Sequence, residues 1–445
     1  MTIIFNMLWK VKLSNIGPFK EAEIELKPLT IFIGKNSVGK SYFLRLLWAI
    51  SSSSPDYIEF EKRFKEQGGE ELRKRLRSEG RWNKDEVIRY VKLYVNSFTY
   101  SIISGIGKRI GIIDHNIVSH GKEIGNISIT SDIMNISFSI TKGRISYSFS
   151  YKDIINIEVT KTFPLGLVFK VGSEEYDRED GIKDENDLDE VLGLELLYIF
   201  SSILSPIFQG DSAILLVDGR AGLTEFLSSP LRSMKISDYL SIVDKEYLTT
   251  FYLLLEQFDK GTLKQEIFSD FFEELGFALK LIKKSGVKSP YVKMWNNVLL
   301  PLSQAPSGIR EALPIALSLS SPSSSTVFIE EPEVHLHPKA QKLMAKMIAR
   351  AVNSEKYIFI TTHSDYLLSS ISNLISLSSH LDKAKELGFK DNEILRKDKV
   401  VAYLIKSEGN HSKVDQIEIT DEGIMESEFT KVAEELLDER GNILG

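Results

Sequence analysis

Hydrophobic and polar positions alternate along residues 8–33, with a turn signal, Asn15-Ile16-Gly17-Pro18, in the middle. Such alternation is typical of half-buried strands. A continuous apolar stretch from Leu29 to Ile33 follows and predicts a buried strand. Behind it, apolar residues between Tyr42 and Ile50 recur at helical spacing. The predicted order is therefore strand, glycine-containing loop and helix.

Helical and strand patterns follow each other in the middle of the chain. Residues 59–103 are highly charged and have helical spacing, whereas residues 126–172 contain short alternating segments separated by Gly and Asp, as in antiparallel strands. The acidic stretch from Glu174 to Glu190 predicts a solvated loop that leads into a helix ending near Phe208. The chain has no sustained heptad repeat, which excludes a long coiled coil.

The rest of the chain alternates strands and helices, which predicts parallel βα units in an α/β sheet. A strand, AILLVD, precedes a loop, GRAG, and residues 236–283 are predicted to be mostly helical. The later predicted elements are a helix after Ser307, the strand TVFI, a helix opened by Pro338, the strand YIFI, a hairpin over residues 400–419 and an amphipathic helix from Glu426 to Leu437.

Composition narrows the functional classes. With 445 residues, 42% of them hydrophobic, the chain can form one large domain or two to three ordinary ones. The absence of cysteine excludes disulfides, thiolate metal sites and a cysteine nucleophile. The net charge of −7 argues against a protein that coats nucleic acid, although it allows a local basic face. No apolar run reaches the roughly 18 residues that span a bilayer, and MTIIFNMLW lacks the features of a signal peptide, so we expect a cytoplasmic protein with no membrane partner.

The loop between the buried strand and its helix has a phosphate-binding sequence. Residues 34–41, GKNSVGKS, fit the pattern G-x-x-x-x-G-K-[ST]. Its glycines let the backbone fold around phosphates, with N–H groups pointing inward at a helix N-terminus. We expect Lys40 to reach the β- and γ-phosphates of ATP and the Ser41 hydroxyl to bind Mg²⁺. The predicted nucleotide-binding residues of this loop are Gly34, Asn36, Ser37, Val38, Gly39, Lys40, Ser41 and Tyr42.

Charged side chains end two of the later apolar strands. At the carboxyl edge of such a sheet, where ligands bind, we expect Glu330 to hold Mg²⁺, mainly through water, and Glu331 to act as general base toward the attacking water. His363 ends the next strand and is expected to contact the γ-phosphate. Ser307, just before a helix, is either part of an anion-binding nest or simply an N-cap.

Together these motifs resemble those of ABC-type ATPases of the SMC/RecF-like branch, and in particular prokaryotic AAA-labelled ATPases related to the overcoming-lysogenization-defect (OLD) ATPases. The resemblance depends on four segments in order, namely NIGPFKEAEIELKPLTIFIGKNSVGKS, SGIRE, FIEEPEVHLHP and TTHSDYLL. It covers residues 8–50 and 299–375 well, and the last 60 residues loosely.

The resemblance implies a head that works in pairs. Ser307 and Gly308 would form a signature loop that binds the γ-phosphate held by a second subunit, the segment from Val334 to Pro338 would be the D-loop between the two sites, and His363 would be the switch histidine. Two positions depart from the family pattern, because Ile309 replaces a frequent second glycine and Glu330 replaces the commoner Asp. With about 80 residues after His363, we expect no toprim nuclease like that of full OLD proteins.

Four features have two interpretations each. Arg220 either points toward the nucleotide or forms a structural salt bridge. His335 and His337, with Glu333, suggest a metal site, but no third ligand is apparent, so we favour the D-loop. The carboxylates between Asp177 and Glu190 suggest a nuclease centre, yet their polar surroundings favour a solvated loop. Residues 61–92 contain 11 Lys/Arg and 7 Asp/Glu, which is either a weak DNA-binding face or a solvated helix face.

The predicted fold is an α/β P-loop NTPase, an ABC-type ATPase head with an α+β insertion. Residues 1–50 would hold the N-terminal strands and the P-loop, residues 51–295 the insertion, and residues 296–445 the signature, the strand-end carboxylates, the switch histidine and a C-terminal cap. The predicted function is a Mg²⁺-dependent ATPase that forms ATP-sandwiched homodimers and acts as a conformational switch in DNA repair or in defence against phage and mobile elements. The alternative is an ATPase subunit that regulates a separately encoded nuclease or toxin without binding DNA itself. Glu331 and His363 argue against a third possibility, a sensor that binds nucleotide without hydrolysing it.

Overall fold

The computed structural model describes residues 8–78, 82–113, 117–152, 155–162, 165–171, 174–228, 240–284 and 287–444. The chain groups into two units. Unit 1 comprises Met1–Gly17 and Ala49–Asp211, and unit 2 comprises Pro18–Trp48 and Ser212–Gly445. The P-loop and the segment from Ser307 to His363 therefore belong to the same unit, together with residues 212–295, which the sequence had suggested as part of the insertion.

Parallel strands form the centre of unit 2. In spatial order they are β10 (Ala213–Leu216), β14 (Thr326–Glu330), β15 (Tyr357–Thr361), β3 (Leu29–Ile33) and β16 (Val400–Glu408). The first four are buried along their whole length, which explains their continuous apolar sequences, since a parallel sheet is covered on both faces. The register pairs Glu330 with Thr361 and Thr361 with Phe32, so the carboxyl ends of β14, β15 and β3 meet at one edge.

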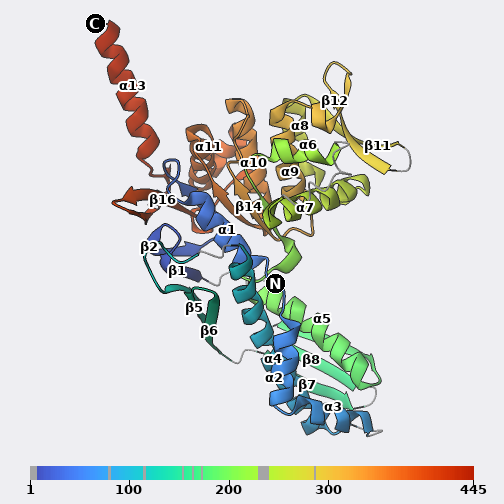
Figure 1. Cartoon of the computed structure of the whole chain (residues 1–445). Coiled ribbons are helices and arrows are strands. Elements are labelled where there is room, and N and C mark those ends of the chain that lie inside the picture. The colour runs from blue at the N-terminus through green and yellow to red at the C-terminus, as the bar shows by residue number, and fades with distance from the viewer. Residues whose placement is uncertain are drawn as a thin grey trace. The chain divides into compact units, whose positions relative to one another are not determined.

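Helices and short strands complete unit 2. Helix α10 contacts α9 and α11, and α7 contacts α9 and β10 (Figure 1). The helices are α1 (Lys40–Ser51), which begins in unit 2, α6 (Arg220–Ser228), α7 (Ile242–Asp259), α8 (Ser269–Glu274), α9 (Ser307–Ser320), α10 (Pro338–Asn353), α11 (Asp365–Ser376), α12 (Leu381–Glu386) and α13 (Glu428–Leu444). The remaining strands are β2 (Phe19–Leu26), β17 (His411–Ile417), β18 (Ile419–Thr420), β19 (Gly423–Ile424) and the separate sheet of β11 (Phe277–Lys284), β12 (Val287–Met294) and β13 (Leu299–Pro301).

Unit 1 combines two antiparallel sheets with four helices. One sheet contains β1 (Trp9–Ile16), β4 (Gly125–Thr130), β5 (Met134–Thr141) and β6 (Arg144–Tyr151), and the other contains β7 (Ile155–Thr162), β8 (Leu165–Val171) and β9 (Glu174–Ile182). Helices α2 (Tyr57–Glu66), α3 (Gly69–Ser78), α4 (Lys84–Ile113) and α5 (Glu185–Ile203) gather beside β7 and β8 (Figure 1). Alternate residues of β4 and β5 are buried, as half-buried strands require.

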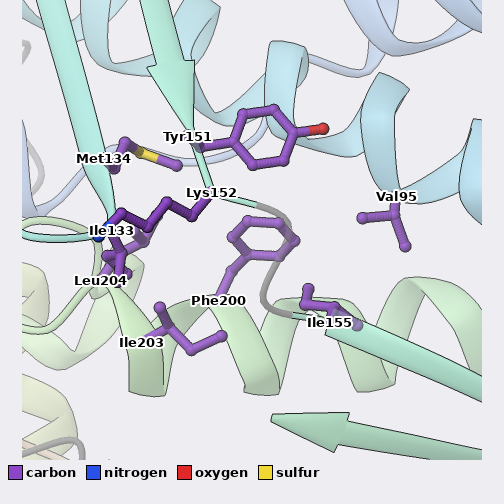
Figure 2. Close-up of a pocket in the computed structure, with 9 residues that line it drawn as sticks. All are labelled: Val95, Ile133, Met134, Tyr151, Lys152, Ile155, Phe200, Ile203 and Leu204. Carbon is purple, nitrogen blue, oxygen red and sulfur yellow. The ribbon is translucent and has the colours of Figure 1, made fainter. Parts of the chain in front are cut away.

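A small apolar cavity lies inside unit 1. Val95, Met134, Tyr151 and Phe200 are among its lining side chains, which come from α4, β5, β6 and α5 (Figure 2). Its volume of about 20 Å³ can hold about one water molecule, whereas ligand pockets usually exceed 300 Å³. We therefore interpret it as a packing gap rather than a ligand site.

Most predicted elements are confirmed, but three segments differ from expectation. Glu174–Ile182 forms β9 instead of a solvated loop, because an edge strand tolerates charged residues that an inner strand does not. The GRAG segment opens helix α6 at Arg220. Within the predicted helical stretch 236–283, β11 begins at Phe277. Phe277 and Leu279 are buried while Ala278 and Lys280 are exposed, as in a half-buried strand. Residues 236–239 lie outside the described residues.

Candidate nucleotide site

The P-loop has the backbone geometry that its sequence predicts. Gly34, Ser37 and Gly39 have positive φ angles of 142°, 63° and 96°. A Cβ atom at Gly34 would lie 2.0 Å from the carbonyl oxygen of Ile405, so no other residue fits there. Within the described part of the chain, the amides from Lys35 to Gly39 donate no hydrogen bond. The loop thus presents a row of free N–H donors, which is the arrangement that binds phosphate.

Lys40 closes over this loop. Its ammonium group donates hydrogen bonds to the carbonyl oxygens of Gly34, at 3.0 Å, and Lys35, at 2.7 Å. Burial lowers the pKa of Lys40 to about 8, although Glu331 and Glu333 oppose the shift through their charges. A buried ammonium group whose partners are only loop carbonyls favours an incoming anion.

The other predicted loop residues occupy distinct positions. Asn36 and Ser37 are exposed on the loop, Ser41 and Tyr42 are partly exposed in the first turn of α1, and Val38 is buried. The Ser412 hydroxyl donates to the Val38 carbonyl at 2.8 Å and so ties the loop to β17.

Glu330, at the end of β14, is fully buried and paired with a residue that the sequence did not reveal. Arg45 donates from Nε and Nη2 to the two carboxylate oxygens of Glu330 at 2.6 and 2.8 Å. The Asp218 amide also donates to this carboxylate at 3.0 Å. Burial raises the pKa of Glu330, while Arg45 acts in the opposite direction. Arg45 lies one helical turn after Ser41, on the same face of α1 near the P-loop. This position is the only sequence feature that could have indicated a role for Arg45 in the site.

Glu331 and His363 face each other across neighbouring strand ends. Glu331 has a positive φ of 45°, and its amide donates to the Thr361 carbonyl at 3.0 Å. A distance of 3.6 Å separates its carboxylate from His363 Nε2, and about a third of each side chain is exposed. Burial and the charge of Lys40 lower the pKa of His363, so a neutral imidazole is favoured. A partly exposed carboxylate at this point can accept a proton from a water molecule.

Glu333 holds the loop that carries His363. Its Oε1 atom accepts hydrogen bonds from the Thr362 hydroxyl at 2.8 Å and from the His363 amide at 2.7 Å. Its Oε2 atom is buried and has no partner among the described residues. Burial raises the pKa of Glu333. The EPE sequence therefore contributes a third acid that fixes the backbone next to His363.

The predicted signature loop packs on the predicted D-loop of the same chain. A Cβ atom at Gly308 would lie 2.7 Å from the carbonyl oxygen of His335, whose φ is 59°. Helix α9 begins at Ser307, and Pro306 rather than Ser307 holds the N-cap position. The N-cap interpretation of Ser307 is therefore wrong by one residue. The amides of Ser307 and Gly308 make no hydrogen bond to other described residues, and so remain available to an anion.

Arg220 is a structural residue rather than a ligand of the nucleotide. Its guanidinium is fully buried and donates to the carbonyl oxygens of Val217 at 2.7 Å, Glu330 at 2.6 Å and Glu331 at 3.0 Å. It also pairs with the Glu311 carboxylate of α9 at 3.1 Å. Of its two interpretations, the geometry supports the salt bridge, which joins the ends of β10 and β14 to α9.

Among the described residues, the remaining candidates make structural contacts. Arg73, in the basic segment 61–92, pairs with Asp189 at 3.0 Å and lies over the Phe64 ring, so it packs against unit 1. Asp189, one of the carboxylates between Asp177 and Glu190, is thereby a structural acid. The side chains of residues 177–181 lie outside the described residues. His337 Nδ1 accepts the Lys339 amide at the start of α10. Among the residues with described positions, no three His, Asp or Glu side chains converge as a metal-binding group.

Comparison with known proteins identifies the family. A family model described as "AAA domain, putative AbiEii toxin, Type IV TA system" matches residues 29–369. No curated protein matches the chain. Across the described helices, none combines the length and apolar character needed to cross a bilayer.

Solved structures give a weak likeness. An SMC head bound to the C-winged helix domain of ScpA is 14% identical, with a TM-score of 0.46, over 93% of this chain and 98% of that one. The SMC head domain from Thermotoga maritima is 9% identical, with a TM-score of 0.39, over 93% and 99%. A Smc head from Pyrococcus furiosus, bound to the C-terminal domain of ScpA, is 11% identical, with a TM-score of 0.45, over 96% and 99%.

The strand–loop–helix around Lys40, with the strand ends of β14 and β15 beside it, confirms the predicted α/β P-loop fold. The family model includes this whole arrangement and covers most of the chain. This chain therefore belongs to the AAA-domain family that carries the AbiEii description.

Proposed function

We propose that this chain binds ATP with Mg²⁺ and hydrolyses the γ-phosphate bond. The observation that carries the proposal is the meeting of Lys40, Glu331 and His363 at one sheet edge, where the charges of these side chains affect one another. A phosphate-binding loop alone would explain binding. The partly exposed Glu331 beside a histidine adds the group that hydrolysis requires.

The residues fit both ATP and its metal ion. The free amides from Lys35 to Gly39 suit a polyphosphate, and Lys40 supplies the positive charge. The Ser41 hydroxyl and the Glu330 carboxylate are oxygen donors of the kind that Mg²⁺ prefers. When bound, Mg²⁺ supplies charge neutralisation at the phosphates. Glu331 would then take a proton from the attacking water, with His363 held in place by Glu333.

Removing Arg45 tests the metal assignment. Because Arg45 holds both oxygens of Glu330, it competes with a cation for that carboxylate. Arg45→Ala is expected to lower the Mg²⁺ concentration needed for tight ATP binding by roughly tenfold, the range of one charged hydrogen bond. Calorimetric titration of ATP at several Mg²⁺ concentrations measures this. Arg45→Lys is the matched control, since it keeps the positive charge but cannot make the bidentate contact with Glu330. Its Mg²⁺ requirement should lie between those of wild type and Arg45→Ala. A higher Mg²⁺ requirement in Arg45→Ala would contradict the competition.

We further propose that two heads share each ATP, with Ser307 and Gly308 of one subunit capping the nucleotide of the other. The amides that start α9 are free, as an anion-binding helix start requires, and isologous pairing about a two-fold axis would complete both sites. Nucleotide that binds only the paired state then stabilises the pair.

Mixing two inactive variants tests this pairing. Lys40→Ala should lose ATP binding, and Ser307→Arg should block the cap while leaving ATP binding to its own head. Each mixed pair retains one intact loop facing one intact cap, so random pairing should restore about a quarter of wild-type phosphate release. Each variant alone is the control. A mixture that stays inactive, together with a protein that remains monomeric with ATP, would point to a monomeric ATPase.

The biological role that we propose is an ATP-driven conformational switch in DNA repair or in defence against phage and mobile elements. The family description names a toxin of a type IV toxin–antitoxin system, which supports a defence role. In the alternative form of the proposal, the head regulates a separately encoded nuclease or toxin. Co-purification from the native host, with and without ATP, distinguishes a bound effector from bound DNA.

A further inference from the structure

The small sheet of β11, β12 and β13 has two unlike faces. Phe277, Leu279 and Val292 are buried on one face. The cross-strand pairs Ala278–Lys293 and Lys280–Tyr291 place the intervening side chains on the other face. There Lys280 and Lys293 are exposed, and Leu299, opposite Lys293, is 45% exposed. Figure 1 shows the β11–β12 hairpin extending away from α8. We call the side with the two lysines the outer face.

An exposed aromatic side chain adjoins the outer face. Trp295 follows β12 directly and is 80% exposed, whereas Trp9, Trp48 and Trp82 are buried. A Cβ atom at Gly276 would lie 3.4 Å from the indole Cδ1, so the ring rests against the glycine backbone. The Trp295 amide donates to the Gly276 carbonyl at 2.7 Å, which fixes the position of the residue. Val298 and Leu299, which follow Trp295 in the chain, are 46% and 45% exposed, and neighbouring exposed apolar side chains of this kind mark an interaction site.

The chain segment that forms this sheet carries charge of one sign. Residues 275–310 contain five lysines, one arginine and no Asp or Glu. Lys280 and Lys293 have no ion-pair partner among the residues that the structure describes, whereas Lys288 is paired with Asp259. The outer face therefore offers uncompensated positive charge within a chain of net charge −7. A polyanion is the complementary ligand.

We infer that the outer face, with Trp295, binds single-stranded nucleic acid. Lysine side chains neutralise backbone phosphates, and an exposed aromatic ring stacks on an unpaired base. A duplex keeps its bases stacked inside and would leave Trp295 unused. Both DNA and RNA strands carry this chemistry, and the experiment distinguishes them.

The position of this face gives the binding a consequence. Residues 302–306 join β13 directly to α9, whose first residues are the proposed cap for ATP. A nucleic-acid strand bound to the outer face would therefore affect residues 302–306 and the start of α9, which we propose caps the ATP of the other head. The inference goes beyond ATP hydrolysis. It rests on the proposed role as an ATP-driven switch in DNA repair or defence, and names single-stranded nucleic acid as the ligand of that switch.

Fluorescence anisotropy of the full chain with labelled oligothymidylate or oligouridylate of about 16 nucleotides tests the inference. Wild-type protein should bind weakly and lose affinity with salt. The double variant Lys280→Glu/Lys293→Glu should bind about tenfold or more weakly, with a salt slope smaller by about 1.4, since each contact to a single strand contributes about 0.7. Trp295→Ala should lose about fivefold to 100-fold at an unchanged salt slope. Stronger binding of one oligonucleotide identifies the natural strand.

The matched control is Lys122→Glu/Lys142→Glu, which makes the same charge change at exposed lysines of unit 1. This variant should stay within about twofold of wild type, because neither lysine belongs to the outer face and salt screens general charge effects. Equal loss in this control would overturn the site, as would tighter binding of a duplex than of a single strand. If the emission of Trp295 instead shifts with protein concentration and not with added oligonucleotide, that result would show that the outer face binds a second copy of this chain rather than nucleic acid. Lys40→Ala should bind nucleic acid like wild type, so a failed ATPase proposal and a failed nucleic-acid site give different results.

Discussion

Replacing Glu331 by Gln is expected to lower the rate of ATP hydrolysis by about 10²-fold or more while ATP binding is retained. The amide keeps the size of the carboxylate but cannot accept a proton from water. Glu331 is suited to that task because it is partly exposed and lies 3.6 Å from His363 Nε2, whereas Glu330 is sealed by Arg45. Phosphate release under saturating ATP measures the loss, and calorimetry measures binding. The trapped variant with ATP should also accumulate as a dimer by light scattering.

Glu333→Gln is the matched control for this prediction. Its amide oxygen can still accept the hydrogen bonds from Thr362 and His363, so hydrolysis should remain close to wild type. Full turnover by Glu331→Gln combined with an inactive Glu333→Gln would move the general base to Glu333. Full turnover by both would leave Glu330 as the next carboxylate to test.

The second large effect is expected on stability. Arg220→Ala should destabilise unit 2 by about 3–5 kcal/mol, because it leaves the buried Glu311 carboxylate without its cation and frees the carbonyl groups of Glu330 and Glu331. Urea unfolding followed by tryptophan emission measures the change. The variant should also hydrolyse ATP slowly, since the strand end that holds Glu331 loses its anchor.

A paired substitution separates charge from packing at this position. Arg220→Met/Glu311→Leu removes both charges and should recover much of the lost stability, as is common when a buried ion pair is replaced by apolar side chains of similar volume. A loss below about 1 kcal/mol in Arg220→Ala, the usual range of an exposed pair, would contradict the anchoring role.

The parts of the site that were predictable are those encoded locally. The P-loop, its flanking strand and α1 are contiguous, so the glycines and the apolar pattern define them without knowledge of the fold. The strand ends at Glu330 and His363 were predictable for the same reason. Arg45 was not, because its partner Glu330 is 285 positions away and only the fold brings them together. Arg220 could not be assigned for a similar reason, since most of its partners are backbone carbonyls, which leave no sequence signal.

The strands that were missed show the limit of composition as a guide. Glu174–Ile182 is acidic enough to suggest a solvated loop, yet an edge position beside β8 allows it to pair. In β11 the alternation of Leu279, Lys280 and Leu281 was present but was included in a longer stretch with helical spacing. Three alternating residues are too few to predict a strand inside such a stretch.

The close contact between Gly308 and the His335 carbonyl has a kinetic consequence. Because a Cβ atom at Gly308 would lie only 2.7 Å from this carbonyl oxygen, the two backbones are in close contact, and a shift of one loop would press on the other. In a pair of heads, a shift caused by one nucleotide would reach the other nucleotide through this shared backbone. Turnover would then rise sigmoidally with ATP concentration, because binding of the first nucleotide would favour binding of the second.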